Sequence, residues 1–202
     1  MKNLYLRSSL VLACALGLAA CGGDDDGNLQ LAGSVYGVSA TGLVLQNNGA
    51  WDTPIEPGTT FFAFKELIGS DTAFNVTIKS NPSNATCEIR NGKGKTGAYS
   101  ISSIEVLCTV IPHNLGGKIT GLTVPGLIIN NGPDRLSIPA NATTFSMTIR
   151  NEKNEPVSGQ VGQSQPYGIT IFQQPTGRTC TVTNGTGTMG TVDIDNVQIT
   201  CV

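Results

Sequence analysis

The chain has 202 residues, of which 13% are charged and 5% aromatic, with 12 Lys and Arg against 14 Asp and Glu. This length suits one or two small domains, and the charge balance excludes the basic surface that binds a phosphate backbone, so no nucleic-acid partner is expected. The 25 glycines and 10 prolines favour turns over helices.

The first 20 residues have the pattern of a secretory signal peptide. Lys2 and Arg7 precede a mostly apolar run that ends at Ala20, and this run is too short for a membrane span of about 20 apolar residues. The motif Leu18-Ala19-Ala20-Cys21, which overlaps the end of this run, resembles the lipobox of bacterial lipoproteins. In that family the peptide is removed before the Cys, which then carries lipid on its sulfur and on its new amino group. The alternative is an ordinary cleaved signal in a secreted protein.

Residues 21–30 are predicted to form a flexible tether behind the lipidated Cys21. The segment Gly22-Gly23-Asp24-Asp25-Asp26-Gly27-Asn28 combines glycine with like charges, which cannot form a core. A Ca²⁺ site would need roughly 6–8 oxygens arranged by a defined loop, so we expect no metal and no other cofactor. Because two or more acyl chains bind a membrane stably, the lipid is the predicted membrane contact. The family resemblance, with Gly rather than Asp after the Cys, favours the outer membrane, on its periplasmic or cell-surface side.

The remainder of the chain consists of two copies of one sequence unit. In the first half of each unit the matching positions lie 84 residues apart, and in the second half they lie 93 apart. Examples are Gly33, Gly37, Gly42 and Leu43, which return as Gly117, Gly121, Gly126 and Leu127, and Thr86-Cys87, which returns as Thr179-Cys180. Two tandem domains, 31–111 and 114–202, are therefore predicted, with a join too short to let them move freely. The change of offset places a nine-residue insertion between Phe145 and Tyr167, where the polar segment 151–156 suits an enlarged loop.

Within each unit the apolar residues alternate with a period of two, as in Phe74-Asn75-Val76-Thr77-Ile78. About six short strands per unit, separated by Asn-Gly and Gly-rich turns, indicate an all-β fold. We predict two tandem immunoglobulin-like antiparallel β-sandwich domains, with a small barrel as the alternative.

Four cysteines remain after Cys14 leaves with the signal peptide and Cys21 takes lipid. Cys87 and Cys108 lie 21 residues apart, as do Cys180 and Cys201. Equal spacing on a repeated framework predicts the disulfides Cys87–Cys108 and Cys180–Cys201, formed in an oxidising compartment. A hairpin that turns near Gly97, or Gly190 in the copy, would bring each pair together. A Cys₄ zinc site would need pairs about two to four residues apart, which this sequence lacks.

Few residues suggest catalysis, and no enzyme activity is expected. The single histidine, His113, lies in the join between the units. A Ser/His/Asp or Cys/His catalytic site would have to be built around it, but its neighbours in sequence are only the two connecting segments. Asp193 and Asp195 share one face of a predicted strand, where exposure to solvent is the default. Trp51, the only tryptophan, follows a turn and is a candidate binding residue, although packing across that turn is the other interpretation.

The pattern Gly-Leu-x-Leu, Asn-Gly, Thr-x-Phe, Thr-Cys and a closing Cys resembles a tandem β repeat of surface and secreted proteins of Gram-negative bacteria. The resemblance covers residues 31–202 and implies no catalytic residues. The predicted function is a non-catalytic, lipid-anchored cell-envelope protein whose two rigid domains bind or space an envelope or extracellular partner. The alternatives are a surface adhesin or assembly subunit that adds strands edge to edge, and an enzyme acting on glycans or by hydrolysis, with its site in loop 150–166 or at the domain junction.

Overall fold

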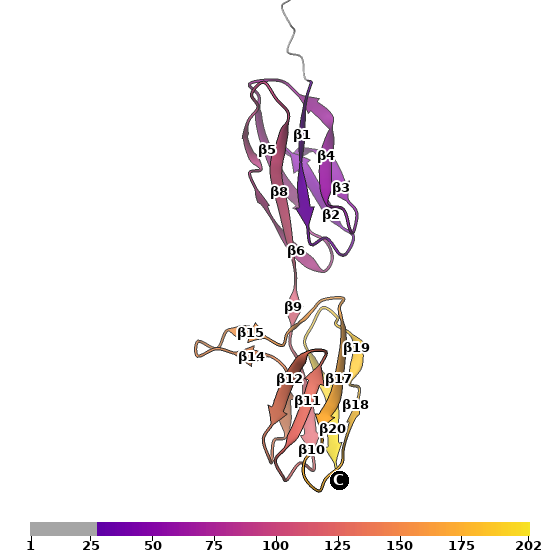
Figure 1. Cartoon of the computed structure of the whole chain (residues 1–202). Helices are drawn as coiled ribbons and strands as arrows, with labels where there is room; N and C mark the ends of the chain where they lie inside the picture. The colour runs from indigo at the N-terminus through magenta and orange to yellow at the C-terminus, as the bar shows by residue number, and fades with distance from the viewer. Residues whose placement is uncertain (1–27) are drawn as a thin grey trace, which may run out of the picture.

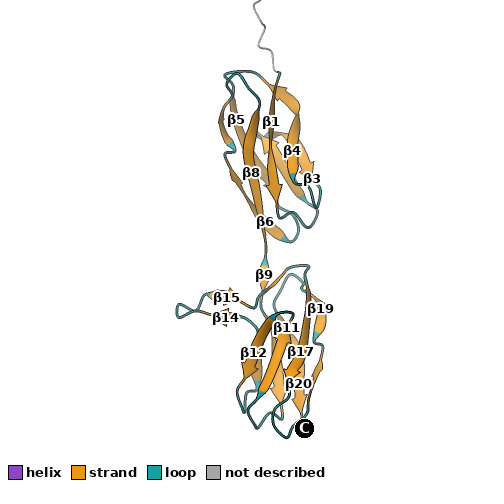
Figure 2. Cartoon of the chain, in the orientation of Figure 1, coloured by secondary structure: helices purple, strands orange, loops and turns teal. Residues whose placement is uncertain are grey.

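The computed structural model describes residues 28–202. The predicted signal peptide, Cys21 and almost all of the predicted tether lie outside this range. The described residues form strands, turns and loops (Figure 2), and none of them belongs to a helix that could cross a membrane. Two β-sandwiches lie end to end, joined by a short segment (Figure 1).

The first sandwich contains eight strands arranged as two four-stranded sheets, ordered β4-β1-β8-β6 and β3-β2-β5-β7. The strands are β1 (Leu29–Tyr36), β2 (Leu43–Asn47), β3 (Ala50–Ile55), β4 (Phe61–Ile68), β5 (Ala73–Ser80), β6 (Ala85–Arg90), β7 (Lys93–Lys95) and β8 (Ile101–Val110).

The second sandwich repeats this order in the sheets β13-β10-β20-β18 and β12-β11-β17-β19. Its strands are β10 (Leu115–Thr120), β11 (Leu127–Asn131), β12 (Asp134–Ile138), β13 (Thr144–Ser146), β17 (Pro166–Gln173), β18 (Cys180–Thr183), β19 (Thr186–Thr188) and β20 (Ile194–Cys201). Four short strands lie outside these sheets: β9 (Pro112–His113), β14 (Ile149–Arg150), β15 (Pro156–Ser158) and β16 (Val161–Gly162).

Each sandwich has its own hydrophobic core, to which both of its sheets contribute. In the first, Leu31, Phe64 and Ile104 from one sheet meet Leu43 and Leu45 from the other, all fully buried. A separate cluster fills the second sandwich. The predicted fold class is confirmed. Each domain has eight core strands rather than about six, because short pieces such as β7 and β19 complete the second sheet.

One strand pair in each domain runs parallel in an otherwise antiparallel sandwich. β1 pairs with β8, and β10 pairs with β20, with a register shift beside Gly33 and Gly117 respectively. A side-chain Cβ at Gly33 would overlap the carbonyl oxygen of Ile104, and one at Gly117 would overlap that of Val197. The close approach of two backbones at this shift therefore explains why glycine recurs at these positions.

The prediction that a hairpin connects the two cysteines of each pair is wrong. Antiparallel pairing of β6 with β8 does place Cys87 opposite Cys108, but the chain between them leaves this sheet, and β7 pairs with β5 in the other. Asn91 adopts a positive φ of 55° at the point of departure, and its side-chain amide donates to the carbonyl oxygen of Ser103. The segment around Gly97 is therefore a crossover between sheets rather than a tight turn.

The nine-residue insertion forms a hairpin that the first domain lacks, whereas the β16–β9 pair that follows it matches the pairing of Ile68 in β4 with Leu29 in β1. β14 and β15 pair as an antiparallel hairpin that projects sideways from the second sandwich (Figure 1). The following strand, β16, pairs antiparallel with β9 in the join between the domains. Of the polar segment 151–156, residues 151–155 thus form the turn of this hairpin, and Pro156 begins β15.

Candidate functional site

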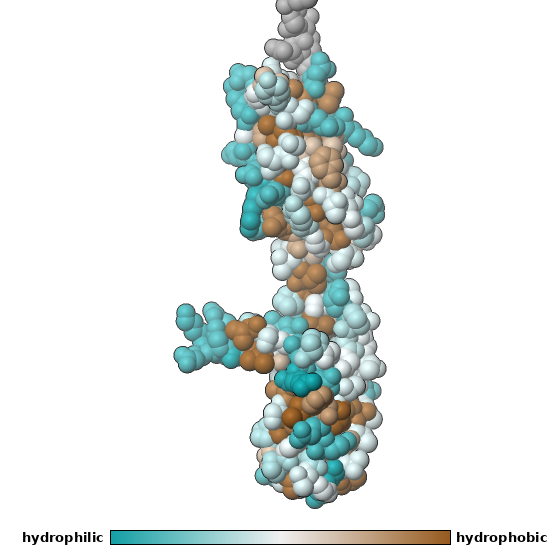
Figure 3. Space-filling view, viewed as in Figure 1, coloured by the Kyte–Doolittle hydropathy of each residue, from teal (hydrophilic) through white to brown (hydrophobic). Residues whose placement is uncertain are grey.

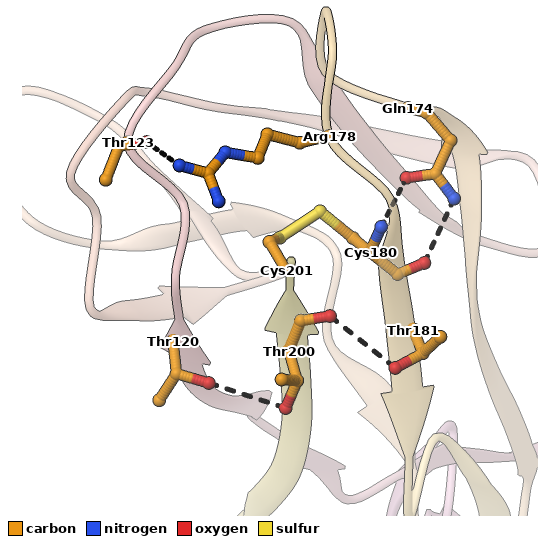
Figure 4. Close-up of a disulfide and its surroundings, with 8 residues drawn as sticks. All are labelled: Thr120, Thr123, Gln174, Arg178, Cys180, Thr181, Thr200 and Cys201. Carbon is orange, nitrogen blue, oxygen red and sulfur yellow. Dashed lines mark hydrogen bonds between the residues drawn. A yellow bond between two sulfur atoms is a disulfide. The ribbon is translucent and has the colours of Figure 1, made fainter.

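The two predicted disulfides, Cys87–Cys108 and Cys180–Cys201, are both present. Each joins an edge strand, β6 or β18, to the neighbouring central strand of the same sheet. Figure 4 shows the second disulfide with the side chains around it. Each disulfide holds an edge strand, which within residues 28–202 has no neighbouring strand on its outer side. The covalent bond therefore stabilises the sheet at this edge.

A side-chain amide covers the edge strand beside each disulfide. In the second domain the Cys180 N–H donates to Gln174 Oε1 over 2.7 Å, and Gln174 Nε2 donates to the Cys180 carbonyl oxygen over 3.0 Å (Figure 4). In the first, the Cys87 N–H donates to Asn81 Oδ1 over 2.8 Å. Asn81 and Gln174 occupy matching positions of the two units but differ in residue type, and nothing in the sequence indicates that both amides face an edge strand.

Other repeated polar residues also hold the fold. Asn47 Oδ1 accepts the Asn75 N–H, and at the matching place Asn131 Oδ1 accepts the Gly168 N–H. Each asparagine ends the strand before the turn and joins it to the neighbouring strand of its sheet. The residues that recur between the domains are thus used for strand pairing, edge cover and close backbone approach.

Trp51 lies in β3, which follows the Asn48-Gly49 turn. Its φ of 60° is unusual for a non-glycine residue. The ring is partly buried against the core of the first domain, and its centroid lies 6.4 Å from that of Phe64 in a tilted arrangement. These contacts favour the packing interpretation of Trp51, and we assign it no binding role.

His113 lies in β9 at the domain junction, beside a small polar cluster at the upper end of the second sandwich. Its Nδ1 lies 3.7 Å from Asp193 Oδ1, and Asp193 also accepts hydrogen bonds from the side chain and the backbone N–H of Asn114 over 2.7 and 2.8 Å. The two donors of Asn114, with a smaller effect from His113, lower the pKa of Asp193 below its ordinary value. Thr148 Oγ1 completes the cluster by donating to Asn114 Oδ1.

This cluster holds the start of β10 against the start of β20, and its hydrogen bonds are internal to the domain. Asp195 lies in β20 and is exposed, whereas Asp193 lies just before that strand, so the two do not share a strand as predicted. Among residues 28–202, no group of three or more His, Cys, Asp or Glu side chains is placed to hold a metal ion. The enlarged loop carries Arg150, Glu152, Lys153 and Glu155, all exposed.

The β14–β15 hairpin is ordered by its own polar side chains. Asn151 Oδ1 accepts the N–H groups of Lys153 and Glu155, each over 3.0 Å, and Asn151 Nδ2 donates to Glu155 Oε2 over 2.9 Å. Arg150 donates to the carbonyl oxygen of Asn154 over 2.8 Å. The turn is therefore preorganised although it stands away from the body of the domain.

Two apolar side chains of this hairpin face solvent. Ile149 is 48% exposed and Val157 is 58% exposed. In Figure 3 the projecting arm is hydrophilic at its tip and hydrophobic nearer the sandwich. The hairpin therefore presents two apolar side chains on an ordered projection.

The base of the hairpin is joined closely to the second sandwich. Gly159 adopts a φ of 77°, and a Cβ at this position would overlap the carbonyl oxygen of Met147. Met147 is itself buried, and its N–H donates to the carbonyl oxygen of Leu115 in β10. Elsewhere in this domain, Asn131, Gln160 and Tyr167 help to line an open hollow of about 450 Å³.

No family model matches the chain, and no curated protein matches it. Among solved structures, the chain is similar to the TIE protein of Bacillus anthracis, with 14% identity and a TM-score of 0.42, over 86% of this chain and 34% of that one. It is also similar to a streptococcal ancillary pilin, with 11% identity and a TM-score of 0.26, over 84% of this chain and 62% of that one. The chain thus spans less than two thirds of either structure, and the fold assignment rests on the strand pairing described above.

Proposed function

We propose that the protein is a non-catalytic, lipid-anchored protein of the cell envelope, in which two stacked β domains present the β14–β15 hairpin to an envelope or extracellular partner. The observation that carries this proposal is the hairpin itself, which stands out from an otherwise repeated framework with two apolar side chains exposed.

The repeated residues support a role in folding rather than in a reaction. Glycines, cysteines and side-chain amides recur because they maintain strand pairing in each copy. A binding function in such a protein is expected where the copies differ, since the shared positions are already used by the fold. The largest difference is the insertion that forms the hairpin.

The pattern at the start of the chain supports the anchor. The lipobox-like Leu18-Ala19-Ala20-Cys21 places lipid on Cys21, and Gly at the next position favours the outer membrane by resemblance to bacterial lipoproteins. Two or more acyl chains hold a protein on a bilayer stably. The two sandwiches would then hold the hairpin at a distance from the membrane.

The anchor is tested by replacing Cys21 with Ser. We expect Cys21→Ser to move the protein from the membrane fraction to the soluble fraction, while Cys14→Ser leaves it in the membrane. Continued sedimentation of Cys21→Ser with membranes would refute lipid anchoring.

The presenting role is tested by affinity capture on intact cells, with the double substitution Ile149→Thr and Val157→Thr. Partner recovery should fall sharply in this variant. Leu67→Thr is the matched control, because Leu67 is also 48% exposed but lies on β4 of the first domain. Equal recovery by the hairpin variant and the parent, or an equal loss in the Leu67 control, would show that the hairpin is not the contact surface.

The alternative function, an assembly subunit that adds strands edge to edge, is less well supported at the edge strands beside the disulfides. A strand added along β18 would have to displace the Gln174 side chain, which already fills the hydrogen-bonding positions at Cys180. The bound amide therefore acts against edge-to-edge pairing at this place.

A further inference from the structure

We infer that residues 159–165 of the second domain form a splint, which ties this domain to the end of the first and makes the two sandwiches one rigid body. The inference deepens the proposed function and depends on it for its biological role, because a rigid pair would hold the hairpin in one direction.

The backbone of the splint adds a strand to the join. In the β16–β9 pair, Val161 lies opposite His113 and Gly162 lies opposite Pro112, and the Gln163 N–H donates to the carbonyl oxygen of Ile111 over 2.8 Å. Because Pro112 has no N–H to donate, the donor at Gln163 is an important part of this short ladder. The join is therefore a paired strand rather than a free linker.

The Gln163 side chain extends the contact to the body of the first domain. Its Nε2 donates to the carbonyl oxygen of Ser83 over 3.0 Å, and Ser83 lies between β5 and β6 at the lower end of that sandwich. Its Oε1 lies 3.5 Å from His113 Nε2. With only 9% of Gln163 exposed, removing its partners would leave a buried amide unsatisfied, which is unfavourable.

Apolar packing adds to these hydrogen bonds. A Cβ at Gly162 would lie 2.8 Å from Val110 Cγ1, so the splint passes very close to the last strand of the first domain. Gln165 lines a hollow of about 400 Å³ together with Tyr36 and Val38 of that domain. The two domains are thus in contact beyond the covalent connection.

In the first domain the matching backbone pair, Leu29 with Ile68, lies within β1 and β4. The matching segment of this domain, between Phe61 and Phe74, is nine residues shorter. At the place that corresponds to Gln163, Ser70 lines an open hollow of about 310 Å³ at the upper end of the first sandwich. Among residues 28–202, the side-chain hydrogen bond to another domain therefore occurs in the copy whose upper end meets one.

The hairpin and the splint are consecutive in the chain. β15 ends at Ser158 and β16 begins at Val161, and Gly159 between them packs closely on Met147. The same short stretch therefore sets both the angle between the domains and the direction in which the hairpin projects.

The test compares the full chain with a variant in which residues 161–163 are replaced by Gly-Ser-Gly, using ¹⁵N NMR relaxation of the chain held in detergent micelles. In the parent, we expect both domains to share one rotational correlation time. In the variant, we expect two shorter, separate times with each domain still folded. Separate tumbling in the parent, or shared tumbling in the variant, would overturn the splint.

Gln163→Ala tests the side chain alone, by amide hydrogen exchange. We expect loss of protection in residues 110–114 and 161–163, with unchanged protection in β11 and β17. The control is Gln173→Ala, since Gln173 Nε2 also donates to a backbone carbonyl, that of Gly126, but within its own domain. Unchanged exchange in Gln163→Ala would refute the role of this side chain. Neither measurement reads out membrane attachment or partner binding, so the failure of the splint is distinguishable from the failure of the proposed function.

Discussion

The two domains share a strand order, a disulfide position and a set of repeated glycines, yet they differ at their upper ends. In the first domain Leu29 and Ile68 pair at that end within β1 and β4, whereas in the second the matching residues, His113 and Val161, belong to the separate strands β9 and β16, and the insertion projects a hairpin beside them. Positions kept between the copies therefore serve the sandwich, while the inserted segment forms an outer hairpin and Gln163, where the first domain has Ser70, serves the connection.

The largest expected effect comes from removing one disulfide. Replacing both Cys180 and Cys201 with Ala should lower the free energy of unfolding of the second domain by about 3 kcal/mol, because a closed loop of this length restricts the unfolded chain. The midpoint of thermal unfolding should fall by more than about 10 °C for a domain of this size.

NMR during heating can follow each domain separately. The matching change at Cys87 and Cys108 should destabilise the first domain by a similar amount. If the double variant unfolds at the same temperature as the parent, the disulfide does not stabilise its domain.

The repeated glycines of the parallel pairs come next. Gly33→Ala and Gly117→Ala should each cost about 3 kcal/mol in their own domain, because the new methyl group meets a backbone carbonyl. Gly97→Ala and Gly190→Ala are matched controls with open space around the new Cβ. Denaturant unfolding should separate the two pairs of variants clearly, and equal stability of all four would show that the close approach is unimportant.

The amides that cover the edge strands should give a smaller and unequal effect. Gln174→Ala removes two hydrogen bonds and should cost about 2 kcal/mol, whereas Asn81→Ala removes one and should cost about 1 kcal/mol. Chemical denaturation of each variant measures the difference. An equal loss in the two domains would mean that the second hydrogen bond of Gln174 contributes little.

The smallest effect distinguishes the domains by pH. The Asn114 N–H donates to Asp193 in the second domain, and the matching Gln30 N–H donates to the neutral hydroxyl of Ser100 in the first. Since hydrogen bonds lower the folded pKa of Asp193, its contribution to stability is present above the ordinary carboxyl pKa. This contribution is lost as the pH falls toward the lowered value.

Asp193→Asn should therefore reduce the acid sensitivity of the second domain alone, as measured by thermal unfolding between neutral and acidic pH. Ser100→Ala should leave the pH dependence of the first domain as it is. An unchanged acid profile of Asp193→Asn would show that this carboxylate does not contribute.

Much of the fold could be predicted because its signals are local or repeated. Alternating apolar residues indicate strands whatever their partners, and equal spacing of Cys87–Cys108 and Cys180–Cys201 predicts the disulfides from a comparison of the copies alone. The parallel pairing of β1 with β8 was not predicted, because first and last strands meet only after the whole sandwich closes. The crossover through β7 was missed for the same reason, since Lys93–Lys95 carries no apolar pattern.

The amino-acid sequence by itself determined the all-β class, the duplication, the cysteine pairing and the position of the inserted segment, because these depend on periodicity and on matching residues. Only the tertiary structure decided that Gln174 covers a strand edge, that Trp51 packs on Phe64, and that the insertion becomes a projecting hairpin while the segment after it contacts the first domain. These outcomes depend on which distant backbone groups become neighbours, and a hydrogen bond such as that from Gln163 to Ser83 exists only after both domains have folded.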